Sequence, residues 1–279
     1  MYIISVSYGN DSVAMIRLAY EYKLSGSQVV YCETGWAHPS WEDRILQGEG
    51  LAKEYGFTPH RIRGELLFAD MVRKKKGFPH HRSQFCTGIL KGIPFLKYCE
   101  ENDIERNATV LIGKRREESK ARENTPEYIE DSKYHGGRTV WHPLYLHNEE
   151  QRNELVLKTG MEVLPHRSLE CSPCVNAKKA DFQRVESARI DEIRALEAEV
   201  EHPMFRPAKK MGAFGIDEVL RWAVSPRGRY TPTKPKPTPR VNEHERKWFW
   251  MMSFCKRMEI PHAEKWAWDM AETAYLSHE

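Results

Sequence analysis

In the first part of the chain, short apolar runs alternate with stretches in which apolar residues recur at helical spacing. The runs at 2–4 and 28–32 predict buried strands, and 58–62 is a third candidate strand. Helical spacing of apolar positions predicts helices over 13–19 and from Pro39 to about Tyr55. Strands that alternate with helices favour an α/β fold, in which a parallel twisted sheet carries helices on both faces.

The rest of the chain extends this pattern and then changes character. Residues 108–112 predict another buried strand, and 139–144 a short strand or bend. Further helices are predicted over 65–76, 95–101, 148–159, 178–201 and 216–224, and two more, broken at Pro261, over 244–276. We therefore expect one domain at 1–175 and a helical, basic C-terminal region at 176–279 with a proline-rich linker at 225–240.

The composition is that of a globular protein. Of the 279 residues, 40% are hydrophobic and 30% are charged, a balance that can build a core and argues against a disordered chain. The sequence has no apolar run of the roughly 18 residues that a membrane-spanning helix needs. Met1 leads directly into the first predicted strand, so we expect no signal peptide, no membrane partner and a cytoplasmic location.

A polar turn, Ser7-Tyr8-Gly9-Asn10-Asp11-Ser12, joins the first predicted strand to the first predicted helix. Such a turn directs backbone N–H groups and the positive end of a helix at one point, which suits a phosphate. Gly9 allows close approach of an anion, and Ser7 and Ser12 add hydroxyl donors. The alternative is a helix that Asp11 or Ser12 merely caps. The turn is not a Walker A loop, because it lacks the Gly-Lys-Ser/Thr ending.

Two more polar turns follow predicted strands. Glu33-Thr34-Gly35 follows 28–32, and a charged run that includes Arg115, Glu118 and Arg122 follows 108–112. Ligands of parallel sheets bind beyond the carboxyl ends of the strands, where all these turns meet. Arginines at this edge of the sheet can bind a phosphate through two hydrogen bonds each. The alternative interpretation of the charged run is a loop that is exposed to solvent.

The six cysteines fall into two groups. Cys32, Cys99 and Cys255 have apolar or helical surroundings and are interpreted as core residues. Cys171 and Cys174 are spaced as metal ligands on a predicted loop, and Cys86 lies far upstream at the start of a predicted segment.

Charge is unevenly distributed. The net charge of the chain is +3, yet residues 203–240 contain nine lysine and arginine residues and two acidic ones, a net charge of +7. Aromatic residues are interleaved with these cations, as in surfaces that contact phosphates and stack on bases. The segment therefore predicts a nucleic-acid partner, with a flexible basic tail as the alternative.

Four stretches occur in the order found in a known group of enzymes. The 7–12 turn resembles the PP-loop of the ATP pyrophosphatases, the adenine nucleotide α-hydrolases. Together with three later motifs it resembles the phosphoadenylylsulfate-reductase-like (PAPS reductase-like) members of that group, although Glu33 stands where they have Asp. The later motifs are Thr34-Gly35 with Pro39, Cys86 through Lys91 and Pro94, and Gly113-x-Arg115-x-x-Glu118-Ser119-x-x-Arg122.

The resemblance implies ATP or an adenylylated substrate, Mg²⁺ near Asp11, and reaction at the α-phosphate. It assigns catalysis to Asp11, Lys91, Arg115 and Glu118, and nucleotide binding to Ser7, Gly9, Asp11, Ser12, Thr34, Gly35, Gly113 and Arg122. Iron–sulfur members hold a 4Fe–4S cluster, for which Cys86, Cys171 and Cys174 would supply three ligands here. The alternatives are Zn²⁺ held by these cysteines with His142 or His166, and no metal.

The resemblance is closest to the DNA phosphorothioation sulfurtransferases. It implies an ATP-dependent sulfurtransferase that releases AMP and pyrophosphate and inserts sulfur into nucleic acid, DNA being favoured over tRNA. The sulfur would come from a donor such as a cysteine desulfurase. One alternative is a reductase of adenylylsulfate or phosphoadenylylsulfate, although the Glu-Cys-Gly-Leu setting of the reductase nucleophile is missing near residue 279. The other is a non-catalytic nucleic-acid-binding protein.

Overall fold

The computed structural model describes residues 1–205 and 215–225 and divides the chain into two compact units. The first, the sheet unit, contains Met1–Leu67 and Thr87–Ser172. The second, the helical unit, contains Phe68–Cys86 and the described residues from Pro173 onward. The units do not follow chain order, because a segment of about twenty residues inside the first half belongs with the later helices.

A six-stranded sheet forms the centre of the sheet unit. Its strands are β1 (Tyr2–Val6), β2 (Gln28–Glu33), β3 (Thr58–Arg63), β4 (Thr109–Ile112), β5 (Tyr128–Ser132) and β6 (Arg138–Trp141). They are arranged in the order β3-β2-β1-β4-β6-β5. All neighbours pair in parallel except β5, which runs antiparallel to β6 at one edge. The chain leaves β1 toward β2 on one side and reaches β4 on the other, so the turns after β1 and β4 flank the switch point of the sheet.

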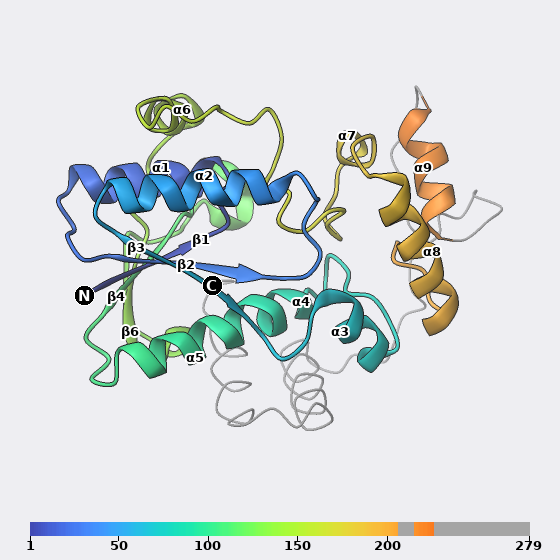
Figure 1. Cartoon of the computed structure of the whole chain (residues 1–279), viewed down its shortest axis with the longest axis horizontal. Coiled ribbons are helices and arrows are strands. Elements are labelled where there is room, and N and C mark those ends of the chain that lie inside the picture. The colour runs from blue at the N-terminus through green and yellow to red at the C-terminus, as the bar shows by residue number, and fades with distance from the viewer. Residues whose placement is uncertain (206–214, 226–279) are drawn as a thin grey trace. The chain divides into compact units, whose positions relative to one another are not determined.

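Helices cover both faces of this sheet, which confirms the predicted α/β class (Figure 1). One face carries α1 (Asn10–Glu21), α2 (Trp41–Glu54) and α6 (Glu149–Leu157), and the other carries α5 (Ile93–Asn102). β1 shows why both faces are covered, since Ile4 packs into the core beneath α1 and α2 while Ile3 packs into the core with α5. A strand that is apolar on both sides needs cover on both sides.

Short segments complete the sheet unit. These are α4 (Phe85–Thr87), which crosses the boundary between the units, the π-helical turn η1 (Gly88–Gly92), and the 3₁₀ turns η2 (Arg116–Glu118), η3 (Lys120–Arg122) and η4 (Lys133–His135). Among the residues described, no helix is both long enough and apolar enough to cross a membrane.

The helical unit contains α3 (Phe68–Lys75), α7 (Lys179–Phe182), α8 (Ser187–Val200) and α9 (Ile216–Val224). The single helix predicted over 178–201 is wrong, because α7 and α8 are separate. Phe182 packs edge-on against the rings of Phe205 and Trp222, and Glu186 then adopts extended backbone before α8 begins. The predicted helices of 244–276, and the predicted linker 225–240 apart from Ser225, lie outside the described residues.

Candidate active site

The turn between β1 and α1 is sharp and rigidly packed. Tyr8 adopts φ 56°, in the left-handed region, and its side chain is completely buried. Its ring lies against the backbone of α2, where a Cβ added at Gly48 would come within 2.1 Å of it. The sharp turn lets α1 begin at Asn10, directly after the strand, so its free N–H groups lie at the carboxyl edge of the sheet.

The serine hydroxyls hold the turn in shape. The backbone N–H of Ser7 donates to Ser12 Oγ at 2.9 Å, and the two hydroxyls lie 3.2 Å apart. Gly9 is the N-cap residue of α1, and no side chain caps the helix there. The capping alternative for Asp11 or Ser12 is therefore wrong, and Asp11 is available for other contacts.

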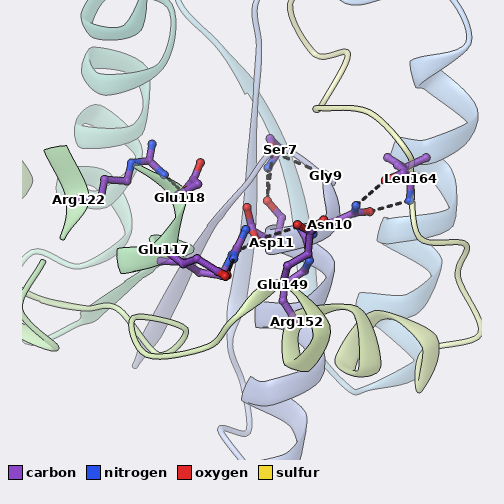
Figure 2. A network of polar contacts seen from close by, with 12 residues as sticks. Ser7, Gly9, Asn10, Asp11, Glu117, Glu118, Arg122, Glu149, Arg152 and Leu164 are labelled. Atoms are coloured by element: carbon purple, nitrogen blue, oxygen red, sulfur yellow. Dashed lines mark hydrogen bonds and ion pairs between the residues drawn. The ribbon is translucent and has the colours of Figure 1, made fainter. Parts of the chain in front are cut away.

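Asp11 is the centre of an ion-pair network (Figure 2). Its Oδ1 accepts a hydrogen bond from Arg115 Nε at 2.7 Å and another from Arg152 Nη1 at 3.2 Å. The two arginine side chains are only 7% and 8% exposed, whereas that of Asp11 is 27% exposed. Gly113 lies beside it, because a Cβ there would be 3.5 Å from Asp11 Cβ. The structure thus brings three predicted site residues together.

Arg152 is a site residue that the sequence pattern did not reveal. It lies on α6, within a stretch interpreted only as a helix, and also pairs with the exposed Glu149. Its burial inside a polar helix is visible only once α6 packs on α1.

The charged run after β4 is not simply a solvated loop. Arg115 is buried, Glu118 pairs with Arg122, and the exposed Glu117 pairs with Arg115 at 3.2 Å. Burial lowers the pKa of Arg122 and of Lys114, and Lys114 is further disfavoured as a cation by the charge of Arg122. Cations crowded in this way are stabilised by a bound anion.

A later segment, residues 162–172, crosses the strand ends and is called the strap. Asn10 holds it through a pair of bonds with Leu164, since Asn10 Nδ2 donates to the carbonyl and Asn10 Oδ1 accepts from the N–H, each at 2.9 Å. Over the 7–12 turn, a Cβ at Gly9 would lie 3.1 Å from Ser168 Cβ. The strap therefore forms one wall above the turn, which no local sequence pattern indicated.

The motif after β2 also binds the strap. Thr34 Oγ1 donates to the carbonyl of Glu170 at 2.8 Å, so this hydroxyl has a structural task. Gly35 adopts φ 67°, and a Cβ there would lie 2.8 Å from Leu67 Cβ, so the turn requires glycine.

Lys91, in η1, forms an ion pair with the Glu170 carboxylate. Burial alone would lower the pKa of Lys91, but Glu170 outweighs it and the pKa lies above its ordinary value.

The three cysteines of the predicted metal centre are divided between the two units. Cys171 belongs to the sheet unit, whereas Cys86 and Cys174 belong to the helical unit. Within the described ranges, no three His, Cys, Asp or Glu side chains form a group that could hold a metal ion. The iron–sulfur and zinc centres stay predictions. Mg²⁺ at Asp11 also stays a prediction, because two arginines already contact its Oδ1.

Comparison with known proteins gives relatives in bacteriophages. A nin-region protein of Escherichia phage lambda, the uncharacterised ORF290, is 32% identical over 143 residues, which cover 42% of this chain and 49% of that protein. An uncharacterised 37.8 kDa protein of Escherichia phage 186 is 25% identical over 225 residues, 70% of this chain and 65% of that protein. The chain thus spans about half to two thirds of the length of these two relatives.

A solved structure of similar outline is the PAPS reductase of Candida auris in complex with phosphate. The two chains are 14% identical, and the match covers 58% of this chain and 74% of that chain. The TM-score is 0.39. The family model described as the phosphoadenosine phosphosulfate reductase domain matches residues 1–172. This match covers more than half of the sequence, including β1–β6 and every residue of the Asp11 network. The chain therefore belongs to the phosphoadenosine phosphosulfate reductase domain family.

Proposed function

We propose that the sheet unit binds ATP at the carboxyl ends of β1 and β4 and cleaves it between the α- and β-phosphates. The observation that carries the proposal is the Asp11 network, in which two buried arginines share one partly exposed carboxylate directly after the 7–12 turn. Buried cations in excess over buried anions favour an anionic ligand. The positive end of α1 points to the same edge of the sheet.

The chemistry asked of these residues is positioning and charge stabilisation. An oxygen of the acceptor forms a bond to the α-phosphorus, the bond to the bridging oxygen breaks, and its electron pair leaves with pyrophosphate. Arg115 and Arg122 would offset the charge that develops on the leaving group, and the N–H groups of the 7–12 turn would orient the phosphates. Lys91 forms an ion pair with Glu170, and Glu118 forms one with Arg122.

For the acceptor we propose nucleic acid, with DNA favoured over tRNA. The terminal sulfur of a persulfide on a donor such as a cysteine desulfurase would then bond to the activated atom of the acceptor, while AMP leaves with its electron pair. A thiol would cleave the remaining S–S bond, forming a disulfide with the donor and leaving the sulfur on the acceptor. Support comes from the net charge of +7 over residues 203–240, most of which lie outside the described residues. Gel mobility shifts of duplex DNA and of tRNA, measured over a series of salt concentrations, test this part. Binding that weakens steeply with salt supports it, and no binding to either contradicts it.

The central experiment measures pyrophosphate and AMP released from ATP and Mg²⁺ by the full chain, with and without DNA. Asp11→Asn should reduce release at least about 100-fold, because Arg115 and Arg152 lose the carboxylate that aligns them. Asp70→Asn, which changes an exposed carboxylate of the helical unit, is the matched control and should act like the wild type. Nucleic-acid binding without any ATP cleavage would instead indicate a non-catalytic binding protein.

The family match favours a second candidate, a reductase of adenylylsulfate or phosphoadenylylsulfate. The same cations would then bind the sulfonucleotide. Sulfite released from either sulfonucleotide in the presence of a thiol reductant, with no pyrophosphate released from ATP, would establish this activity in place of the first.

The cysteine metal centre is proposed from sequence spacing alone. Protein purified without oxygen should be brown and contain iron and acid-labile sulfide if Cys86, Cys171 and Cys174 hold a cluster. Zinc found in place of iron would support the alternative centre, and protein free of metal would reject both.

A further inference from the structure

The last turn of α3 and the chain that follows it, residues 73–82, form a positively charged segment of the helical unit, here called the basic loop. Residues 71–86 contain five lysine and arginine residues and no acidic one, a net charge of +5. Lys74, Lys76 and Arg82 are exposed, so the loop presents cations to solvent.

Both ends of the basic loop are tied by contacts within the helical unit. Arg73 Nε donates to the two carboxylate oxygens of Glu199 on α8, at 3.1 and 2.9 Å, and Arg73 also pairs with Asp70 at 3.4 Å. At the other end, two backbone hydrogen bonds between His80 and Ser83, at 3.2 and 2.8 Å, close a tight turn. Arg73 therefore attaches the loop to α8, and the cations beyond it are the ones that the loop presents.

Lys76 has a backbone conformation that favours glycine. Its φ is 53°, in the left-handed region. Its N–H donates to the carbonyl of Arg73 and the N–H of Gly77 donates to that of Val72, each at 3.1 Å. This pair of bonds ends many helices, usually with a glycine in the place of Lys76. Fold stability therefore does not call for lysine here, and backbone strain of this kind is often found at functional positions.

The chemistry of the loop favours one kind of polyanion. Anionic membranes and nucleic acids both attract clustered cations. Segments that lie on membranes also insert apolar side chains, but Phe78 and Pro79 are buried and the exposed side chains of residues 73–82 are all charged or polar. Lysine and arginine side chains without apolar neighbours suit the phosphates of nucleic acid, which they bind without reading the base sequence.

We propose that the basic loop binds the phosphate backbone of nucleic acid through Lys74, Lys76 and Arg82. The strained conformation of Lys76 then has a function, because glycine would relieve the strain but supply no cation. The inference rests on the nucleic-acid acceptor proposed above, but not on cleavage of ATP or on sulfur transfer.

Lys76→Gly separates binding from folding. Glycine suits the backbone at this position, so K76G should unfold at the same temperature as the wild type or a higher one. We expect its affinity for duplex DNA or tRNA, measured by fluorescence anisotropy on the full chain, to fall about fivefold near 0.15 M salt. The dependence of log affinity on log salt concentration should become shallower by about 1, as for the loss of one phosphate contact.

Lys23→Gly is the matched control. Lys23 is exposed and adopts φ 57°, and its N–H donates to the carbonyl of Tyr20 while the N–H of Leu24 donates to that of Ala19. It therefore ends α1 as Lys76 ends α3, but it belongs to the sheet unit and lies outside the basic loop. K23G removes the same charge and the same strain, so it should bind nucleic acid like the wild type.

The outcomes distinguish this inference from the proposed function. Equal binding by K76G and the wild type, or equal losses in K76G and K23G, would overturn the inference and leave the nucleic-acid acceptor standing. A wild type that binds vesicles containing phosphatidylserine but neither DNA nor tRNA would overturn both. Weaker binding by K76G alone supports the inference, even where no pyrophosphate is released from ATP and the proposed cleavage fails.

Discussion

Asp11 has one carboxylate oxygen that two buried guanidinium groups share. The carboxylates on the outer side of this group, Glu117 and Glu149, are 55% and 70% exposed, so solvent screens their charge. Counting only buried groups, positive charge from Arg115 and Arg152 exceeds negative charge. This excess of positive charge favours the binding of an anion, so the arrangement of these few residues bears directly on function.

Arg152→Met should lower the free energy of unfolding by about 1–2 kcal/mol, because it removes a charge-assisted hydrogen bond while Arg115 still holds Asp11. Urea unfolding measures the change. Arg221→Met provides the comparison, since Arg221 is 65% exposed and its ion pair with Glu218 should contribute less than about 0.5 kcal/mol. Equal effects of the two substitutions would show that Arg152 does not act as a buried partner.

At the scale of elements, helix α2 holds the 7–12 turn in place. Gly48 and Gly50 lie on this helix two residues apart, in different surroundings. A Cβ at Gly48 would come within 2.1 Å of the Tyr8 ring, whereas a Cβ at Gly50 would meet nothing within 4 Å. One glycine therefore serves packing, and the other only weakens the helix.

The two glycines should respond to alanine in opposite ways. Gly48→Ala should lower the free energy of unfolding by about 2–3 kcal/mol, because the Tyr8 ring must move, and should also weaken nucleotide binding. Gly50→Ala should raise it by about 0.5–1 kcal/mol through better helix propensity. Thermal and urea unfolding report both signs, and a stabilising Gly48→Ala would refute the packing of Tyr8 against α2.

At the scale of the whole molecule, two buried histidines couple folding to pH. Burial is the main cause that lowers the pKa of His135 to about 3 and that of His142 to about 4. Both lie in the sheet unit, His135 in η4 before β6 and His142 directly after it. Below the ordinary histidine pKa of about 6.5, the unfolded chain binds protons that the folded chain does not.

Stability should therefore be fully present above about pH 6.5 and fall as the pH decreases toward about 4. Urea unfolding at intervals between pH 7.5 and 4.5 measures the slope of the unfolding free energy against pH. His135→Asn should make that slope shallower over this range, whatever it does to stability at pH 7.5. Parallel curves for variant and wild type would show that His135 is not the source.

The strands and helices of the sheet unit were largely predictable because their signals are local. The apolar runs at 28–32 and 108–112 became β2 and β4, and helical spacing marked α1. β5 escaped because Tyr128–Ser132 is polar and mostly exposed at the edge of the sheet, where no apolar run is needed. The break between α7 and α8 escaped because it depends on aromatic partners from elsewhere in the helical unit.

The order of residues along the chain was enough to reveal the 7–12 turn and the arginine motif, because each is contiguous and its chemistry depends on spacing. The contacts that Arg115 and Arg152 make with Asp11 could not be predicted, because these arginines lie 104 and 141 positions away from it in the sequence. The strap and the buried ring of His142 also came to light only with the fold. Periodicity and turn chemistry act over a few residues, whereas these contacts depend on which strands become neighbours, and only the packed sheet decides that.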